Sequence, residues 1–596
     1  MERLAFDIEV YRNYFLVMFR NITTGNVIAF EKFEGQPLDT HSVLMNLRRR
    51  CTVGFNSINF DFPVLFGALA GKSNSELKDI SDSIIVTGLK PWHVENKFGF
   101  KIEKSLNHID LIEVAPGKAG LKLYGGRIHT KKLQDLPIDP SAMISPEDRE
   151  VLKMYCGNDL TLTEELHNYL LPQIELREKM SKEYDIDLRS KSDAQIAEAV
   201  IKSQIRKLTK SLPERPVIEQ GTAYKYKAPA FIKFKSKILQ DTLKMVESSD
   251  FIVISGGKLD MPSDLKSHII KMGSSEYRMG MGGLHSCEES VSHVSDELGQ
   301  LYDRDVVSYY PAIILRCKLF PEHIGEEFLS VYKAIVDRRI EAKKTGNKVV
   351  ADALKITVNG SFGKLGSMWS ALYAPNLLIQ TTLTGQLSLL MLIEMFEARG
   401  ITVLSANTDG VVFKTKDEDL AKSIVKEWEL ATGFETEETK YKALYSRDIN
   451  NYIAIKPDGT AKLKGAYTSG GLQKNPANEI VSEAVVAFLS KNIPVEETIK
   501  NCKELRKFIT IRTVQGGATY DGGYLGKVVR WYYGTTSKCP IHYKVNGHLV
   551  PRSTGAVPCM DLPDEFPADI NYDWYITEAR SVLADIGWKE IGDGGV

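Results

Sequence analysis

The sequence predicts a multidomain protein of mixed α/β and α+β class, and three observations support this prediction. The chain has 596 residues, which is too long for one hydrophobic core, so we expect about three to five folding units. Short apolar strands alternate with helical stretches over the first 170 residues, as in an α/β domain. A second α/β block is expected at about 300–470, after a lysine-rich connector at 180–270.

The composition indicates an ordinary globular protein. The formal net charge is −1, so the charge of the whole chain neither favours nor excludes nucleic-acid binding. The seven cysteines are scattered along the chain and form no CxxC pair, and we therefore expect neither a zinc site nor a disulfide framework. Since we find no signal segment and no run of about 18 apolar residues, we expect a cytoplasmic protein without a membrane span.

The most basic stretch lies at 201–250, with eleven Lys or Arg residues against five Asp or Glu. Its lysines are interleaved with aromatic residues from 224 to 237. Basic residues between aromatic ones can follow a phosphate backbone and stack on bases. The alternative is a solvated, half-buried strand pair, which explains this stretch better when it is taken alone.

Asp7 and Glu9 stand two residues apart in a predicted strand at 4–10. The period of a strand therefore puts both carboxylates on one face and Phe6 and Ile8 on the other. Two acids on one face repel each other unless a divalent cation compensates them. Taken alone, the pair is more often explained by a solvated strand face.

Two later segments add further acids. Asp61 follows a short strand at 53–55, so we expect it just beyond a strand end. Asp159 and Tyr155 lie one turn apart on a helix that begins after Ser145 and that we expect Pro172 to end.

In order and spacing, these segments resemble the three exonuclease motifs of the DEDD superfamily, in its tyrosine-containing branch. The resemblance implies an RNase-H-like 3′→5′ exonuclease domain that hydrolyses phosphodiesters with two metal ions. It also implies that Tyr155 orients the attacking water and that Asn56 and Phe60 contact the single-stranded 3′ end. The implied metal ligands are Asp7, Glu9, Asp61 and Asp159. Since none of these residues is missing, we expect an active exonuclease.

A second pair of aspartates is predicted at strand ends. Asp305 lies in segment 303–311, where a strand leads into a Ser-Tyr-Tyr-Pro turn. Asp409 lies in the turn of a β-hairpin predicted at 401–413. A carboxylate at a strand end can point into a cleft and bind metal, although an ordinary turn explains each segment alone.

Cations lie on two helical stretches between these aspartates. The first helix, predicted at 326–344, places Arg339 and Lys343 one turn apart, and Lys355 begins the second. Cations on facing helices can clamp a triphosphate. For each cation alone, a solvated helix face is the more common explanation.

The order Asp-x-x-Ser-x-Tyr-Pro, Lys-x3-Asn-x3-Gly and Thr-Asp resembles motifs A, B and C of family B DNA polymerases, and most closely the compact phage-encoded members. The resemblance implies a right-hand polymerase that extends a primer with two Mg²⁺ ions per active site, for which Mn²⁺ can substitute. It assigns metal binding to Asp305, Val306 and Asp409, nucleotide binding to Tyr310, Arg339, Lys343, Lys355 and Asn359, and DNA binding to Gly363, Tyr452 and Lys464. It also implies that Tyr310 excludes ribonucleotides.

The resemblance implies a domain layout and a set of partners. We expect an exonuclease domain at 1–185, a connector and the start of the palm at 186–295, palm at 296–325 and 371–470, fingers at 326–370, and a thumb and C-terminal subdomain at 471–596. Primed DNA template and dNTPs are the expected substrates, and a helicase, a single-strand-binding protein and other replisome factors are candidate partners. We expect a monomer, located in the host cytoplasm if it is phage-encoded.

This sequence departs from the family pattern at two places. Motif C usually reads Tyr-x-Asp-Thr-Asp-Ser, whereas this chain has Ser405, Asn407 and Gly410, so an amide replaces the first acid. The later Lys-x-Tyr element has Asn450 in place of its lysine. These departures leave two alternatives open: an exonuclease whose decayed polymerase half acts as a DNA-binding scaffold, and a non-enzymatic nucleic-acid-binding protein.

The spacing between the motifs that contain Asp305, Lys355 and Asp409 indicates what kind of primer the protein extends. Only 50 residues separate Asp305 from Lys355, and only 54 separate Lys355 from Asp409. Protein-primed relatives carry sizeable insertions in these two gaps, for which we find no room. We therefore expect a polymerase that extends nucleic-acid primers, with limited unaided strand displacement.

Overall fold

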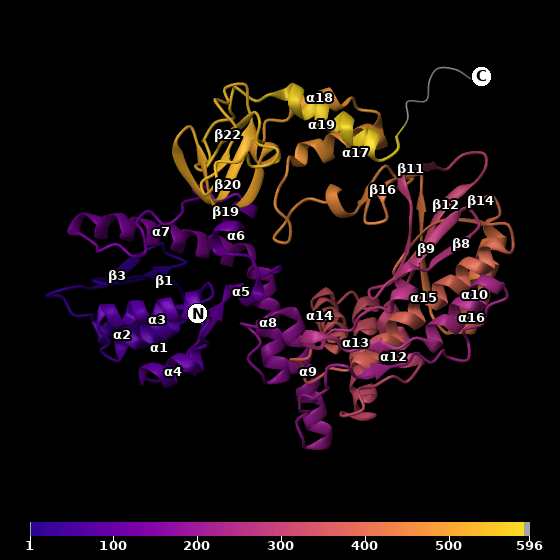
Figure 1. Ribbon diagram of the computed structural model, residues 1–596, viewed down its shortest axis with the longest axis horizontal. Helices are drawn as coiled ribbons and strands as arrows, with labels where there is room; N and C mark the ends of the chain where they lie inside the picture. Colours follow the sequence, from indigo (N-terminus) through magenta and orange to yellow (C-terminus); the bar gives the residue numbers. More distant parts are fainter. Residues whose placement is uncertain (1, 589–596) are drawn as a thin grey trace. The chain divides into compact units, whose positions relative to one another are not determined.

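The structure is a computed structural model that describes residues 2–588, and the chain folds into two compact units (Figure 1). Unit 1 contains the chain up to Ser192 with Ser469–Ile480 and Cys502–Tyr575, and unit 2 contains Asp193–Thr468, Val481–Asn501 and the described residues from Ile576. Both units combine helices with sheets, which confirms the predicted mixed α/β multidomain class. The segment after 470 is divided between the units, and the predicted domain layout stays a prediction.

Unit 1 is built on a five-stranded sheet of order β3-β2-β1-β4-β5. Its strands are β1 (Arg3–Tyr11), β2 (Tyr14–Asn21), β3 (Val27–Lys32), β4 (Cys51–Gly54) and β5 (His108–Asp110). β1, β2 and β3 are antiparallel to one another, whereas β4 runs parallel to β1 and β5 parallel to β4. This mixed sheet matches the α/β pattern that the sequence predicts for the first 170 residues.

Helices cover both faces of this sheet (Figure 1). Helix α7 (Pro146–Tyr169) packs on the face that carries Ala5 and Leu16, and α1 (Thr40–Arg49), α2 (Asp61–Leu69) and α3 (Asn74–Thr87) pack on the face that carries Phe6 and Ile8. The alternation along β1 is therefore the one predicted, and it turns Asp7 and Glu9 toward α7. The prediction that Pro172 ends this helix is wrong, because α7 ends at Tyr169 and Pro172 lies in the first turn of α8 (Leu171–Tyr184), where a proline leaves no hydrogen bond unmade.

The C-terminal part of unit 1 is a second sheet of order β21-β19-β20-β22. Its strands are β19 (Thr510–Tyr520), β20 (Gly523–Tyr533), β21 (His542–Tyr543) and β22 (Ala556–Pro558), and the short helices α4 (Pro91–Phe98), α5 (Leu111–Val114) and α6 (Leu121–Arg127) complete the unit. Arg530 of β20 is fully buried and donates to the carbonyls of Thr130 (2.6 Å) and Cys559 (2.6 Å). Because a buried guanidinium needs several acceptors, this residue ties the C-terminal sheet to the N-terminal part of the unit.

Unit 2 is built on a seven-stranded antiparallel sheet of order β15-β12-β14-β13-β10-β9-β8. Its strands are β8 (Ile269–Met272), β9 (Ser275–Met279), β10 (Leu284–Ser286), β12 (Gln300–Val306), β13 (Thr402–Asn407), β14 (Gly410–Thr415) and β15 (Thr436–Tyr441). A smaller sheet contains β11 (Glu289–Val294), β16 (Ala443–Asp448), β17 (Asn451–Ile455) and β18 (Ala461–Leu463). The hairpin predicted at 401–413 is present as β13 and β14.

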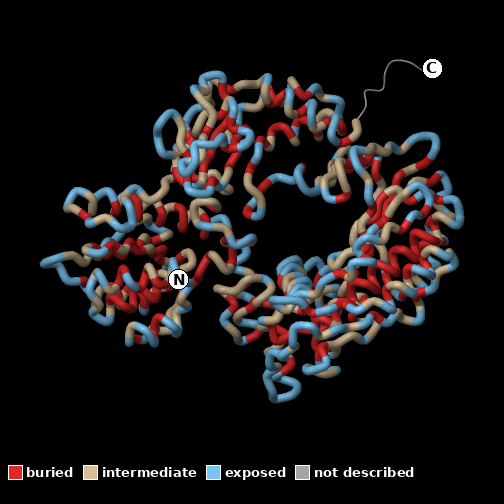
Figure 2. Tube along the Cα trace, viewed as in Figure 1, coloured by how far each residue is buried: buried red, intermediate tan, exposed pale blue. Residues whose placement is uncertain are grey.

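Helix α15 (Pro375–Glu397) forms the core of unit 2 together with the large sheet and α16 (Glu418–Thr432). Among the helices within residues 2–588, α15 alone is long and apolar enough to cross a membrane. However, 83% of its apolar window is buried inside the structure, so packing accounts for its composition (Figure 2). Polar residues such as Gln386 and Glu394 interrupt it, which is why the sequence shows no continuous apolar run.

The remaining helices of unit 2 include the predicted pair between the two aspartates. They are α9 (Asp193–Thr209), α10 (Lys237–Ser248), α12 (Tyr309–Arg316), α13 (Glu327–Lys344), α14 (Lys348–Leu365), α17 (Glu479–Lys491), α18 (Val495–Asn501) and α19 (Tyr572–Asp585), of which α17 and α19 are shared with unit 1. The strand pair predicted around 224–237 is mostly wrong, since only β6 (Ala223–Tyr224) pairs, with β7 (Phe251–Ile252). Tyr226 and Ile232 instead bury their side chains in the core from an irregular segment.

Candidate active sites

The structure brings together three of the four acids of the first set in unit 1. Asp7 and Glu9 project from β1, and Asp61 is the first residue of α2. Asp7 and Asp61 are close enough for the charge of Asp7 to raise the pKa of Asp61. Ligand atoms of Asp7, Glu9 and Cys156 all lie within 4.8 Å of one another. Cys156 is not among the predicted ligands, although Tyr155 precedes it directly in α7.

Burial strongly perturbs this cluster. It raises the pKa of Asp7 to about 6, and it raises the pKa values of Glu9 and Asp61 well above their ordinary range, with the charge of Asp7 adding to the effect on both. Burial also raises the pKa of Cys156, so that this residue stays a thiol. Ionised carboxylates in such a site need a compensating cation, and carboxylate oxygens are the ligands that Mg²⁺ prefers. The first acid set therefore fits a divalent metal ion.

Lys122 is a further residue of this site, and it was not found from the sequence. It lies on α6, its ammonium group forms an ion pair with Asp159, and it lies 4.5 Å from the centre of the Tyr155 ring. Burial lowers the pKa of Lys122 to about 8, while Asp7 and Glu9 oppose this shift. Tyr155 and Asp159 are both buried and lie one turn apart on α7, as their spacing predicts, and Lys122 links Asp159 to the cluster.

Asp110 holds the loop that contains Asn56 and precedes Asp61. Its carboxylate is fully buried and accepts hydrogen bonds from the backbone nitrogens of Asn56 (2.7 Å) and Ile58 (3.0 Å). Asn56 has a left-handed backbone with φ 59, which asparagine tolerates better than most residues. Asn56 and Phe60 are both half-buried, so each leaves part of its surface accessible. No local pattern marks Asp110, because its partners lie 54 and 52 residues away.

We expect Mg²⁺ to stabilise unit 1 more at about pH 8 than at about pH 5. When the folded state raises the pKa of a carboxyl group, the free energy of unfolding falls as the pH rises from the unfolded pKa to the folded one. For Asp7 this pH window runs from 3.8 to about 6. A divalent ion compensates the charges that remain above this window. In thermal denaturation with Mg²⁺ or with EDTA, the expected difference is about 2–4 °C at the higher pH and close to zero at the lower.

The control for this prediction is Asp7→Asn with Asp61→Asn, which removes two charges and keeps the shape of both side chains. In this variant the pH-dependent part of the Mg²⁺ effect is expected to disappear. An equal Mg²⁺ effect at both pH values in the unmodified chain would contradict the prediction.

Of the two aspartates of the second set, Asp305 lies on β12, and Asp409 lies in the turn that leads into the neighbouring strand β14. Asp305 of β12 pairs with Gly410 of β14, and the backbone nitrogen of Val306 donates to the carbonyl of Asp409 (2.7 Å). Burial raises the pKa of both aspartates. A Cβ atom at position 410 would lie 2.2 Å from Oδ1 of Asp305, so glycine keeps the space beside this carboxylate open. The pair offers carboxylate oxygens, which are the ligands that a divalent ion such as Mg²⁺ prefers, and thus fits such an ion.

Asn407, which replaces the first acid of motif C, has a structural role. Its Nδ2 donates to the carbonyl of Ile449 (3.1 Å), and its Oδ1 accepts from Oγ1 of Thr408 (3.1 Å). Both ends of the amide are thus engaged within the fold, and a carboxylate at this position would have no proton for the Ile449 carbonyl.

Replacing Asn407 by aspartate is therefore expected to destabilise unit 2 by about 1–3 kcal/mol and to give no gain in primer extension. The loss arises because a carboxylate oxygen would face the Ile449 carbonyl without a hydrogen bond. Thermal denaturation and an extension assay measure the two effects. Asn450→Asp, at an exposed position of the neighbouring turn, is the stability control because it adds the same charge. Faster extension by Asn407→Asp than by the unmodified chain would contradict the structural role of the Asn407 amide.

Two residues predicted to contact the nucleotide are held at the chain segment that follows Asp305. Nη1 of Arg339 on α13 donates to Oγ of Ser308 (2.9 Å). The ring of Tyr310 stacks on Phe362 of α14, with centroids 4.2 Å apart, and its hydroxyl donates to the carbonyl of Gly282 (2.6 Å). Burial raises the pKa of Tyr310 to about 12, so the phenol stays protonated.

The other predicted contacts lie on exposed surfaces. Lys355, Asn359 and Gly363 share one exposed face of α14, and Lys343 is exposed on α13. On the smaller sheet, Lys464 lies 5.8 Å from the centre of the Tyr452 ring, and its charge opposes the raised pKa of Asp409.

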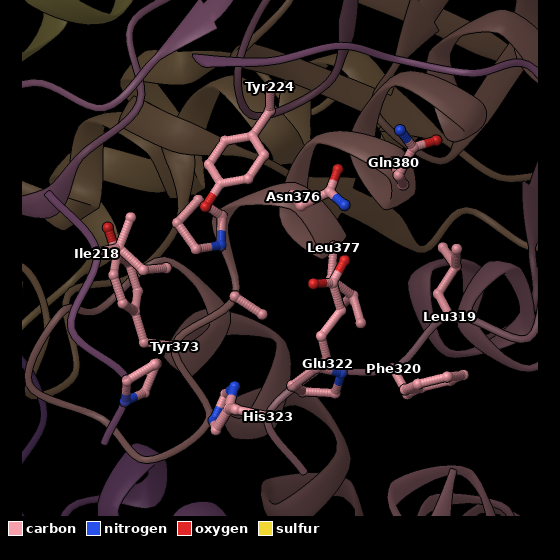
Figure 3. A pocket seen from close by; sticks show the side chains of 14 residues that line it. Ile218, Tyr224, Leu319, Phe320, Glu322, His323, Tyr373, Asn376, Leu377 and Gln380 are labelled. Carbon is pink, nitrogen blue, oxygen red and sulfur yellow. The ribbon is translucent and has the colours of Figure 1, made fainter. Parts of the chain in front are cut away.

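Unit 2 also contains a pocket of about 310 Å³ that none of the predicted site residues lines. Tyr224, Tyr373 and His323 lie around it (Figure 3). The hydroxyl of Tyr373 and the ring of His323 are hydrogen-bonded to backbone carbonyls, which gives both side chains a structural role. The side chains that line the pocket do not indicate a particular ligand.

Comparisons with known proteins find partial sequence similarity to DNA polymerases. The chain is 24% identical over 172 residues to DNA polymerase 1 of Saccharolobus solfataricus, which covers 28% of this chain and 19% of that protein. It is 27% identical over 154 residues to DNA polymerase 1 of Sulfurisphaera ohwakuensis, covering 26% and 16%. It is 30% identical over 145 residues to DNA polymerase II of Escherichia coli, covering 20% and 18%. The matched segments thus span less than a fifth of each of these curated relatives.

Among solved structures, the family B DNA polymerase from the hyperthermophilic archaeon Pyrobaculum calidifontis aligns with 100% of this chain and 78% of its own chain. The TM-score is 0.41 and the sequence identity is 16%. No protein-family model matches the chain.

Proposed function

The chain belongs to the family B DNA polymerases, and on this premise we propose that it is a template-directed DNA polymerase with its own 3′→5′ proofreading exonuclease. The observation that carries the proposal is the proximity of Asp305 on β12 to Asp409 in the turn before the neighbouring strand β14, although the two residues are 104 positions apart in sequence. A separate buried acid cluster in unit 1 supports the second activity.

For synthesis, Asp305 and Asp409, with the backbone of Val306, would hold divalent metal ions. These ions supply charge neutralisation and alignment for the attack of a primer 3′-hydroxyl on the α-phosphate. Arg339, Lys343 and Lys355 neutralise the triphosphate. Tyr310, fixed by Gly282 and Phe362, lies under the deoxyribose and excludes a 2′-hydroxyl. Asn359 and Gly363 lie against the nascent base pair, and Tyr452 and Lys464 contact the primer.

For proofreading, the four acids of unit 1 would hold the metal ions that activate a water molecule. Tyr155 orients this water, and Lys122 balances the charge of Asp159. Asn56 and Phe60, on the loop held by Asp110, contact the single-stranded 3′ end. Because a mismatch weakens base pairing, it frees the 3′ end from the synthesis site and favours its hydrolysis.

The proposed layout is a right hand in which the large antiparallel sheet of unit 2 is the palm and α13 and α14 are the fingers. Helices α12, α13, α14 and α15 account for most of the two short gaps around Lys355, which supports extension of nucleic-acid primers rather than protein priming. Primed DNA and dNTPs are the proposed substrates, and a helicase and a single-strand-binding protein are candidate partners.

The first experiment uses a 5′-labelled primer on a longer template, with Mg²⁺, with and without dNTPs. Extension with dNTPs and shortening without them is the expected result. Shortening under both conditions would favour an exonuclease with a DNA-binding scaffold, and no change under either would contradict both activities.

A further inference from the structure

Asp303 is a buried carboxylate beside the synthesis site that none of the family motifs assigns. It lies two residues before Asp305 on β12, so both side chains project from the same face of the strand. Asp303 is only 4% exposed, whereas the side chain of Asp305 is 47% exposed. A carboxylate in such a place requires partners that satisfy its charge and its lone pairs. Tyr441 of the adjacent strand β15 donates its hydroxyl proton to Oδ2 of Asp303.

The second partner of Asp303 is Lys462, which reaches it from the other sheet. Lys462 lies on β18, and its Nζ is 3.0 Å from Oδ2 of Asp303 and 3.3 Å from Oδ2 of Asp305. Although burial opposes the effect, the charges of Asp303 and Asp305 hold the pKa of Lys462 above its ordinary value, so it stays an ammonium group. One cation therefore bridges a buried acid and a proposed metal ligand.

The position of Lys462 is fixed by packing between the two sheets. Beside the bridge, an apolar cluster joins β12, β14 and β15 of the large sheet to β16 and β17 of the smaller one, through Leu301, Val412, Tyr441, Leu444 and Ala454. In the register of the smaller sheet, Lys462 pairs with Ala454, a member of this cluster. The opposite face of β12 has its own ion pair, between Arg304 and Glu438 (2.6 Å), so the bridge belongs to the side that carries the aspartates.

We propose that Lys462, anchored by Asp303 and Tyr441, is a positioning residue that fixes the carboxylate of Asp305 and reduces the negative charge that a divalent ion meets there. The proposal rests on the proposed polymerase function of this site. It also accounts for Asn450, which stands where the Lys-x-Tyr element has a lysine, because a lysine from β18 supplies a cation beside the same aspartates. Without this bridge, Asp305 would be free to rotate and its site would be more negative.

The test measures Mn²⁺ binding in the absence of nucleotide, by the loss of the electron paramagnetic resonance signal of free Mn²⁺. All variants carry Asp7→Ala and Asp61→Ala, so that the site in unit 1 does not contribute. Lys462→Met is expected to bind Mn²⁺ about threefold to tenfold more tightly, because a positive charge is lost near the ligands at a partly solvated position. The same variant is expected to extend a primer about tenfold to a hundredfold more slowly, because Asp305 is no longer fixed.

Lys440→Met is the matched control. Lys440 lies on β15 and is paired with Glu418 (3.0 Å), and its side chain is 41% exposed against 38% for Lys462. It is expected to change neither Mn²⁺ affinity nor extension by more than about twofold. Asp303→Asn removes the anchor but keeps the ammonium group, so extension should fall while Mn²⁺ affinity does not increase.

A Lys462→Met variant with the Mn²⁺ affinity of Lys440→Met would overturn the proposal. If circular dichroism shows that Lys462→Met does not fold, Lys462→Arg is used to test the proposal instead. It keeps the charge and is expected to retain the parental Mn²⁺ affinity, so tighter binding by this variant would also overturn the proposal. Asp305→Ala in the same background distinguishes failure of the proposed role of Lys462 from failure of the proposed polymerase function. If Asp305→Ala neither weakens Mn²⁺ binding nor slows extension, the proposed polymerase function itself is wrong.

Discussion

Replacing Asp305 by alanine is expected to reduce primer extension by at least about 10³-fold while leaving the shortening of single-stranded DNA unchanged. Asp305 projects from β12 and Asp409 from the turn before the neighbouring strand β14, and each has a raised pKa because burial disfavours its charge. Loss of one carboxylate leaves too few ligands to hold and align metal ions in the synthesis site. The effect is measured with a 5′-labelled primer, with dNTPs for extension and without them for shortening.

The control for Asp305→Ala is Asp419→Ala, which removes an exposed aspartate from α16 in the same unit and is expected to leave both activities unchanged. Extension by Asp305→Ala at the rate of this control would mean that Asp305 is not a ligand of the synthesis site. Loss of shortening together with extension would mean that one site performs both reactions.

Replacing both Asp7 and Asp61 by alanine is expected to have the opposite effect, a loss of shortening by at least about 10³-fold with extension retained. The two carboxyl groups belong to the cluster that includes Glu9, and burial raises the pKa values of all three. Removing two of them relieves the repulsion but also removes the oxygen ligands that a metal ion requires. The same labelled primer without dNTPs measures the loss, and a primer with a mismatched 3′ end shows whether editing is lost with it.

Asp79→Ala is the control for this pair. Asp79 lies on α3 in the same unit and forms an exposed ion pair with Arg12 (3.0 Å), which contributes little to stability. If the Asp7→Ala, Asp61→Ala double variant shortens the primer as fast as Asp79→Ala does, the acid cluster of unit 1 is not the hydrolytic site.

The local structure around both sites was predicted from short-range patterns. The alternation along β1 predicted that Asp7 and Glu9 share a face, and helix α7 begins at Pro146, directly after Ser145, whose side chain accepts from the backbone nitrogen of Asp148. The hairpin around Asp409 followed from two β-prone runs joined by turn residues. In each of these cases the residues that determine the conformation are neighbours in the chain.

Predictions failed where distant contacts override local preference. The segment from 224 to 235 has strand-like composition, yet Tyr226 and Ile232 are drawn into the core of unit 2 and little of the segment pairs. Asn407 stands where the family motif has an acid, and its amide donates a hydrogen bond to the carbonyl of Ile449, a contact that the local sequence does not predict. A side chain's neighbours across the fold decided both cases.

The sequence by itself determined which acids occur in which order, the strand face or helix face that each occupies, and hence the resemblance to a polymerase with an exonuclease. Only the tertiary structure decided which charged partners those acids meet: Lys122 beside Asp159, Asp110 under the loop of Asn56, and Lys462 between Asp303 and Asp305. The physical reason is that strand period and helix caps are set by neighbouring residues, whereas a buried charge is satisfied by whichever side chain the fold brings near. The partner of a single lysine or aspartate cannot be predicted from the sequence pattern around it.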